Sequence, residues 1–358
     1  MVASDQKNKY LIIGPSWVGD MVMAQSLFID IKNREPQSQI DVLAPAWTGA
    51  LIDRMPEVTE LVPANFNHGK LSLGERFSLG KKLRDKNYTH AITLPNSLKS
   101  ALVPAVAKIT TRTGFIGEQR WGLLNNIRKL DKKVLPMTVQ RFIALGLPKQ
   151  ANVRAIDSIP APLLKVSHEQ VANVLEKNNL NRDSQTLILC PGAEFGASKK
   201  WPAQQYAQTA SYYLEQGWQV WLMGSDNDVD ACNEIDRLTG HKSHVLAGKT
   251  TLPEAIDLIS CASLVVSNDS GLMHIAAALQ KPLVAVYGST DPGHTPPLSG
   301  NHKIARLGLI CSPCFKRDCP LEHLDCLKTL PAETVIKLGD ALLLSERQSS
   351  QGENEAEQ

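Results

Sequence analysis

The chain has 358 residues, of which 43% are hydrophobic and 21% are charged, and its formal net charge is +2. This composition is typical of a soluble chain with room for two domains of about 150 residues each. No apolar run reaches the roughly 20 residues that a membrane-spanning helix needs, and the polar start MVASDQKNKY lacks a signal sequence, so we expect a cytoplasmic protein.

The charge is distributed unevenly along the chain. Residues 1–160 carry 22 Lys and Arg against 13 Asp and Glu, a balance of +9, while the remainder carries 16 against 23, a balance of −7. Such a block either solvates a surface or attracts an anionic partner, and both interpretations stay open. No nucleic-acid motif and no aromatic-rich basic stripe accompanies it, so we expect no nucleic-acid partner.

In the first half, short apolar runs alternate with helical patterns. Strands are predicted at residues 9–14, 39–45, 60–64 and 90–95, and helices at 21–34, 74–87 and 97–109. A Pro-rich stretch at residues 157–167 reads as a linker. The alternation then resumes, with strands predicted at 186–192, 219–225, 243–248, 263–269 and 282–288, and helices at 201–217, 227–240, 252–262 and 271–280.

This alternation predicts an α/β protein with two doubly wound domains that face each other. We expect the domains at residues 1–160 and 165–331, and a polar, disordered tail at residues 347–358. Ligands of open α/β sheets bind beyond the carboxyl ends of the strands, so the chemistry is expected there.

The first such strand end carries an unusual glycine loop. Gly14 and Gly19 have the spacing of a phosphate-binding P-loop, but Asp20 and Met21 stand where Lys and Ser or Thr would follow. A carboxylate at this position either caps the next helix or accepts a proton from a substrate.

Two later strand ends are typical of anion sites. In CPGAEFGASKKWP, residues 190–202, Gly192 allows close approach of a ligand, and Lys199 and Lys200 supply positive charge before a helix. In VVSNDSGLMHIAAA, residues 265–278, the amides of Ser270 and Gly271 open a helix that carries His274. The alternatives are a loop with solvated lysines in the first stretch, and a simple helix cap by Asp269 or Ser270 in the second.

Together with GPSWVGDMVMAQSL, APAW, MPEV, LPNSLKSALVP, RTGFIGEQRWGLLN and PLVAVYGSTDPGHTPPLS, these stretches follow one another in order between about residues 10 and 300. On them the chain resembles the heptosyltransferase family of lipopolysaccharide core assembly. The resemblance implies a GT-B fold, in which two Rossmann-like domains face each other across a cleft. It also implies that a last helix near residues 332–346 packs back on the first domain.

The resemblance further implies an inverting transfer of heptose from ADP-heptose to the first heptose of a lipid-anchored lipopolysaccharide core. No cofactor and no catalytic metal are expected, and the enzyme would work at the cytoplasmic face of the inner membrane, with peripheral association at most. Two alternatives remain: another nucleotide-sugar transferase of the same fold, or a nucleotide-sugar-binding module without turnover.

Residue roles follow from the same resemblance. Asp20 is expected to be the catalytic base, and Lys199, with Lys200 ranked second, to neutralise the departing diphosphate. Asp269, Ser270, Gly271 and His274 match the donor-binding signature. Met223 and Gly224 end a strand where adenine or ribose would lie, although a Met at a strand end is more often a core residue.

Candidate acceptor-binding residues lie in the basic half. Asn96 and Lys99 follow a predicted strand end, and Arg112 and Arg120 belong to the stretch 112–126. Their expected partners are the phosphate and acidic-sugar groups of the acceptor, while a role as solvated surface stays open for each.

Four cysteines cluster at residues 311–326 in CSPCFKRDCPLEHLDC. Cys311, Cys314, Cys319 and Cys326 form a candidate structural metal site, because a C-x-x-C pair with two further thiols can surround Zn²⁺. The spacing matches no standard zinc finger, so free or redox-active thiols and disulfides remain as alternatives.

Overall fold

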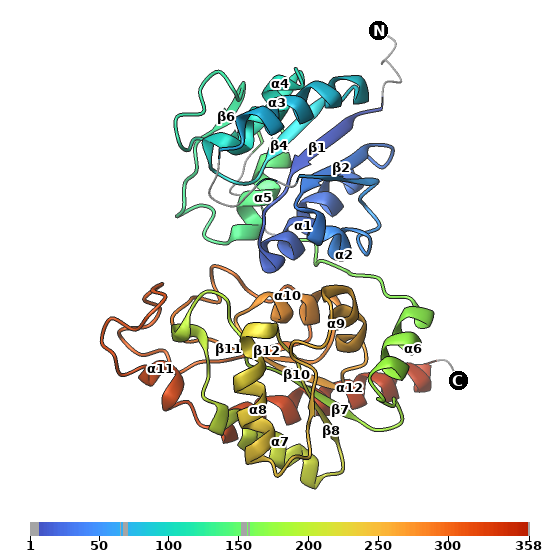
Figure 1. Cartoon of the computed structure of the whole chain (residues 1–358), viewed down its shortest axis with the longest axis vertical. Helices are drawn as coiled ribbons and strands as arrows, with labels where there is room; N and C mark the ends of the chain where they lie inside the picture. The colour runs from blue at the N-terminus through green and yellow to red at the C-terminus, as the bar shows by residue number, and fades with distance from the viewer. Residues whose placement is uncertain (1–6, 65, 67–70, 152–155, 157, 357–358) are drawn as a thin grey trace. The chain divides into compact units, whose positions relative to one another are not determined.

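The structure is a computed structural model that describes residues 7–64, 66, 71–151, 156 and 158–356. The chain divides into two units, Met1–Pro162 and Leu163–Gln358, drawn from blue to green and from green to red in Figure 1. The expected linker, residues 157–167, spans this division, and its residue 157 lies outside the described residues.

The first unit contains a six-stranded parallel sheet with the strand order β3-β2-β1-β4-β5-β6. Its elements are β1 (Lys9–Ile13), α1 (Val18–Arg34), β2 (Gln39–Ala44), α2 (Gly49–Ile52), β3 (Glu60–Pro63), α3 (Leu73–Lys82), β4 (His90–Thr93), α4 (Leu102–Val106), β5 (Thr111–Phe115), β6 (Asn126–Arg128) and α5 (Thr138–Gly146). Alternate residues of β1 reach opposite faces, so Leu11 and Ile13 share one core cluster with Leu83 and Val103.

The second unit repeats the same winding, because its strand order β12-β11-β10-β7-β8-β9 has the same pattern. Its elements are α6 (His168–Lys177), β7 (Thr186–Cys190), α7 (Ala203–Glu215), β8 (Gln219–Leu222), α8 (Val229–Leu238), β9 (His244–Val245), α9 (Leu252–Ile259), β10 (Leu264–Asn268), α10 (Gly271–Ala278), β11 (Leu283–Val286), β12 (His302–Ala305), α11 (Asp325–Lys328) and α12 (Ala332–Ala356). All residues of β7, β10 and β11 are buried, as expected for inner parallel strands covered on both faces.

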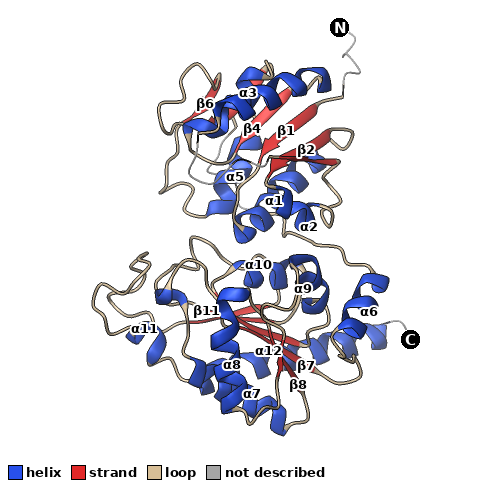
Figure 2. Cartoon of the chain, in the orientation of Figure 1, coloured by secondary structure: helices blue, strands red, loops and turns tan. Residues whose placement is uncertain are grey.

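Helices cover both faces of each sheet, as Figure 2 shows with strands in red and helices in blue. In the second unit, α7 packs with α8 and α12, while α9 packs with α6 and α10. The predicted fold class, two doubly wound α/β units, is therefore confirmed.

Three strands escaped the sequence prediction. β5, β6 and β12 read TRTGF, NIR and HKIA, which lack a long apolar run. β6 and β12 lie at the edges of their sheets, where partial exposure tolerates polar side chains.

The C-terminal helix α12 packs within the second unit, against α7 and strands β10 to β12. Its buried stripe of Ala332, Val335 and Leu342 explains this, and Tyr212 Oη donates to Asp340 Oδ2 over 2.7 Å. Its expected contact with the first unit stays a prediction. The tail expected to be disordered from residue 347 instead continues the helix to Ala356, consistent with its Gln, Glu and Ala content.

Candidate active site

The carboxyl ends of β7 and β10 mark the candidate site of the second unit. These strands are neighbours in the sheet although β8 and β9 lie between them in the chain. The helices that follow them, α7 and α10, belong to the two different helix layers. A pair of adjacent strands whose following helices diverge is the place where open α/β sheets bind ligands. We call the residues that follow β7, β8, β10 and β11 the switch-point site.

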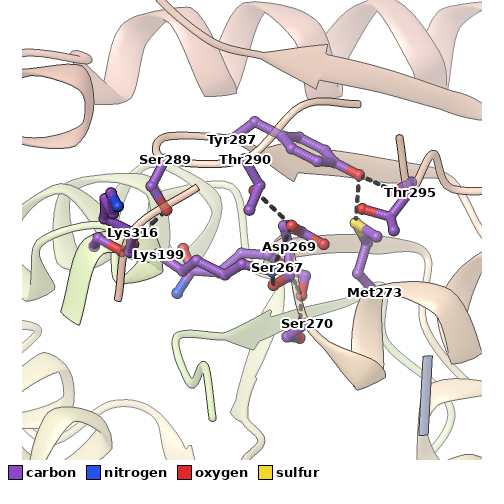
Figure 3. A network of polar contacts seen from close by, with 12 residues as sticks. Lys199, Ser267, Asp269, Ser270, Met273, Tyr287, Ser289, Thr290, Thr295 and Lys316 are labelled. Carbon is purple, nitrogen blue, oxygen red and sulfur yellow. Dashed lines mark hydrogen bonds and ion pairs between the residues drawn. The ribbon is translucent and has the colours of Figure 1, made fainter. Parts of the chain in front are cut away.

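An ion pair lies at the centre of the switch-point site. Lys199 Nζ is 2.7 Å from Asp269 Oδ2, and the side chains of Lys199 and Asp269 are only 14% and 5% exposed. The hydroxyl of Thr290 donates to the same Asp269 oxygen over 2.6 Å, as Figure 3 shows. Phe195 lies with its ring centroid 5.1 Å from Lys199 Nζ. The lysine is thus held in a largely desolvated place, where its charge acts strongly.

The amide of Asn268 fixes the strand ends beneath this pair. Its Oδ1 accepts hydrogen bonds from the Trp201 backbone N–H over 3.2 Å and from Tyr206 Oη over 3.0 Å. Its Nδ2 donates to the Pro191 carbonyl over 2.7 Å. Asn268 is fully buried, so one side chain joins β10, the loop after β7 and the start of α7.

The predicted anion-binding helix begins at the expected place. α10 starts at Gly271 with Ser270 as its N-cap residue, and the Ser270 side chain makes no capping hydrogen bond. Its hydroxyl lies 3.3 Å from Ser267 Oγ instead, as drawn in Figure 3. The N–H groups and positive dipole end of this first turn suit a phosphate.

His274 is buried one turn into α10 and is 5% exposed. Burial lowers its pKa to about 4, and the nearby Lys199 charge lowers it further, while Asp269 opposes the shift. The imidazole is therefore neutral at neutral pH, and it offers hydrogen bonding rather than positive charge.

A second carboxylate lies at the ends of β7 and β8. Asp228 is 6% exposed, accepts hydrogen bonds from Ser225, and pairs with Lys200 over 3.5 Å. Gly192 and Gly224 pack directly against it, since a Cβ on Gly192 would lie 2.3 Å from Asp228 Oδ2 and one on Gly224 would lie 2.7 Å from Asp228 Cβ. The glycines are therefore required for this packing.

The structure places one predicted donor residue in the core. Met223 is fully buried at the end of β8, so it does not present its side chain to a ligand here. Its backbone N–H donates to the Leu189 carbonyl, as a continuation of the parallel ladder. This corrects the donor-binding expectation for Met223.

Sequence reasoning missed Thr290, Asp228, Asn268 and Phe195. Thr290 and Asp228 follow the carboxyl ends of β11 and β8, so the strand-end rule could have singled them out. The role of Asn268 depends on partners 62 to 77 residues away in the chain, which no local pattern reveals.

In the first unit, Asp20 lies in the first turn of α1, which follows β1, and its side chain is partly exposed. Trp17 is the N-cap residue of this helix, so Asp20 does not occupy the capping position. Gly14 is enclosed, since a Cβ there would lie 2.8 Å from Met21 Cε. The start of the loop before Asp20 is therefore packed against α1 and β2, whereas Ser16 and Trp17 are exposed.

The two predicted acceptor arginines are occupied by the protein itself. Arg120 is 2% exposed and donates to the carbonyls of Pro95 and Phe115. Arg112 donates to the carbonyls of Leu123 and Ile109 over 2.6 and 2.7 Å. Both guanidinium groups hydrogen-bond loop backbone. Arg120 is buried and so does not offer its side chain to an acceptor, whereas Arg112 is partly exposed and its acceptor contact stays a prediction.

Asn96 and Lys99 are more accessible. Asn96 is exposed, and its Oδ1 accepts a hydrogen bond from Arg120 over 3.3 Å. Lys99 is partly exposed and forms no ion pair with any residue that the structure describes. Both follow β4, which is next to β1 in the sheet.

The four cysteines of residues 311–326, which we call the cysteine segment, are free thiols, and so are the other three cysteines of the chain. Burial raises the pKa of the Cys326 thiol, and the nearby Cys311, Cys314 and Cys319 raise it further. Within the described ranges, no group of three or more His, Cys, Asp or Glu is arranged to hold a metal ion, so the candidate metal site is not formed.

The backbone of this segment is anchored to the switch-point site instead. The Phe315 N–H donates to the Ser289 carbonyl over 2.7 Å, and the Ser198 N–H donates to the Arg317 carbonyl over 3.1 Å. The segment therefore supports the residues next to Thr290 and Lys199.

Among the described helices, none has the length and apolar character to cross a bilayer.

Comparison with known proteins gives matches across this architecture. The family model described as Glycosyltransferase family 9 (heptosyltransferase) matches residues 76–325. Lipopolysaccharide heptosyltransferase 2 of Escherichia coli K12 is 44% identical over 346 residues, covering 94% of this chain and 99% of that protein. Lipooligosaccharide heptosyltransferase 2 of Haemophilus influenzae is 47% identical over 311 residues, covering 83% and 88%.

A solved structure matches as well. The structure of E. coli ADP-heptose lipopolysaccharide heptosyltransferase II has a TM-score of 0.84 and 42% sequence identity, and the match covers 95% of this chain and 99% of that one.

Proposed function

The chain belongs to glycosyltransferase family 9 (heptosyltransferase), and from that premise we propose that it transfers heptose from ADP-heptose to the first heptose of a lipopolysaccharide inner core. Its enzyme class, a glycosyltransferase of lipopolysaccharide core assembly, follows from relatives at 44% to 47% identity. ADP-heptose as donor is supported by the description of the E. coli structure.

The observation that carries the proposal is the Lys199–Asp269 pair at the switch point, next to the uncapped start of α10. A diphosphate there meets one ammonium group and several helix N–H groups. Both stabilise the negative charge that grows on ADP as the bond from the anomeric carbon to the phosphate oxygen breaks. The electron pair of that bond leaves with ADP.

The proposed nucleophile is a hydroxyl of the acceptor heptose. Asp20 takes its proton while the hydroxyl oxygen forms the new bond to the anomeric carbon, in one in-line displacement that inverts the configuration. Asp269 and neutral His274 are proposed to bind donor hydroxyls. Gly192 and Gly224 are proposed to contact the nucleotide through their backbone, since Asp228 packs against their side-chain positions. Lys200 supports Lys199 as a second positive charge.

Asn96 and Lys99 remain the proposed acceptor contacts, because both are accessible at the end of β4. The net charge of +9 in residues 1–160 suits a phosphorylated, acidic core. Since the acceptor is proposed to be lipid-anchored, we propose peripheral association with the cytoplasmic face of the inner membrane.

Replacing the proposed base tests the mechanism. Asp20→Asn removes the proton acceptor but keeps the shape, so kcat is expected to fall by about two to four orders of magnitude while ADP affinity stays nearly unchanged. The rate of heptose transfer in a timed assay gives kcat, and isothermal titration calorimetry gives the affinity for ADP. Asp30→Asn is the matched control, since Asp30 lies on the same helix and pairs with Arg34 over 2.7 Å.

Unchanged turnover in Asp20→Asn would remove the base assignment. The acceptor is tested with purified ADP-heptose on heptose-free and on mono-heptosylated cores. Transfer to the heptose-free core alone would favour heptosyltransferase I activity, and nucleotide binding without any transfer would favour a binding module.

A further inference from the structure

One oxygen of Asp269 receives two strong hydrogen bonds. Lys199 Nζ approaches Asp269 Oδ2 to 2.7 Å, and Thr290 Oγ1 donates to the same atom over 2.6 Å. Figure 3 shows the three side chains converging from the loops after β7, β10 and β11. Asp269 is 4% exposed, so its carboxylate depends on protein donors rather than on water.

The two hydrogen bonds to Asp269 Oδ2 are affected differently when a diphosphate binds. If Lys199 neutralises the leaving group, its ammonium must direct hydrogen bonds toward phosphate oxygens that now compete with Asp269. A buried carboxylate that loses a charged donor is destabilised unless another donor stays in place. Thr290 is the donor that remains, because its hydroxyl carries no charge to be drawn toward the phosphate.

We propose that Thr290 is a positioning residue of the donor site, which holds Asp269 when Lys199 turns to the diphosphate of the nucleotide. The inference rests on the proposed function, because it takes the role of Lys199 from there. Thr290 acts through Asp269 and Lys199, and it lowers the cost of moving Lys199 from its resting partner to the ligand.

Contacts between the neighbouring residues hold the Thr290 loop and the Lys199 loop together. Ser198 Oγ donates to Ser289 Oγ over 3.0 Å, and Ser289 N–H is 3.4 Å from the Ser198 carbonyl. Ser198 precedes Lys199 and Ser289 precedes Thr290, so one pair of serines ties both donors of Asp269 together. Ser198 is 1% exposed and Ser289 is 1% exposed, which makes this tie a buried one.

The test compares Thr290→Val, which removes the hydroxyl, with Thr290→Ser, which keeps it, in the full-length protein. ADP is the probe, with affinity measured by calorimetry and transfer measured separately. Thr290→Val is expected to weaken ADP binding about tenfold to a hundredfold, the range for loss of a hydrogen bond to a charged group. Thr290→Ser is expected to stay within about threefold of the wild type. Thr209→Val removes a buried hydroxyl that donates to the Gln205 carbonyl within α7, and it serves as the matched control without effect.

A double-mutant cycle separates positioning from a general structural role. In a Lys199→Met background there is no ammonium to move from Asp269 to the diphosphate, so the Thr290 hydrogen bond is the same with and without ADP, and adding Thr290→Val should change ADP affinity less than about twofold. Equal losses in both backgrounds, or unchanged ADP binding in Thr290→Val, would overturn the inference. If Thr290→Val weakens ADP binding as expected but the wild type transfers no heptose, the inference about Thr290 stands and the proposed transfer is refuted.

Discussion

At the scale of single residues, the switch-point site combines a largely buried cation, Lys199, with a buried neutral imidazole, His274. Lys199 is paired with Asp269, whereas His274 has a pKa of about 4 because burial disfavours its charged form. In the proposed donor complex, positive charge for the diphosphate therefore comes from Lys199 and from the α10 terminus, and His274 contributes shape and a neutral hydrogen bond.

His274 predicts a specific pH dependence of stability. Its folded pKa of about 4 lies below the reference value of 6.5, so between these values the unfolded chain binds a proton that the folded chain does not. Stability from this group is complete above about pH 6.5 and is lost as the pH falls toward 4, by about 1.4 kcal/mol per pH unit.

The measurement is denaturant unfolding of the wild type and of His274→Gln at pH 7, 6 and 5. The free energy of unfolding should fall less steeply with acid in His274→Gln, because glutamine does not titrate. Parallel curves for the two proteins would contradict the buried, neutral assignment.

At the scale of elements, Asn268 is the clearest structural prediction. Asn268→Ala leaves the Trp201 N–H and the Pro191 carbonyl short of a partner and leaves Tyr206 Oη only its bond to the Cys190 carbonyl, so it should lower the free energy of unfolding by about 2–4 kcal/mol. Tyr206→Phe removes one donor from the same group, and should cost about 1 kcal/mol. Urea unfolding measures both, and equal effects would show that the amide does not act as the common partner.

Elements with continuous apolar patterns could be predicted from the sequence. The runs that became β7, β10 and β11 are fully buried, and burial is what makes such runs apolar. β6 and β12 could not be recognised in the same way, because short edge strands need few apolar residues. The placement of α12 depends on which exposed surface its stripe meets, which is a property of the whole unit.

The same contrast holds for the site. The loops after β7 and β10 were predictable, because the strand-end rule and the glycines are local signals. The occupancy of Arg112 and Arg120 by backbone carbonyls was not, since the acceptors lie in loops that fold around them. Thr290 could be recognised as a partner of Asp269 only once β10 and β11 lay side by side.

At the scale of the whole molecule, each unit has its own sheet and its own core cluster. Every residue of the switch-point site belongs to the second unit, including the supporting cysteine segment. We therefore predict that residues 163–358 expressed alone bind ADP but transfer no heptose, because Asp20 is missing. Calorimetry with ADP tests this, together with circular dichroism as a check of folding. A folded fragment without ADP affinity would contradict a self-contained donor site.

The repeated strand order has a final consequence. Both sheets are wound alike, so β1 in the first unit corresponds to β7 in the second. Asp20 and Lys199 then lie at equivalent positions in the two units, because each follows the central strand of its sheet, β1 or β7. In the proposed mechanism these two equivalent positions carry opposite charges, with proton removal by Asp20 in the first unit and stabilisation of the leaving group by Lys199 in the second. A chimera that exchanges the second unit for another unit with this winding would therefore have to carry over the loops after β7, β10 and β11, which hold Lys199, Asp269 and Thr290 together.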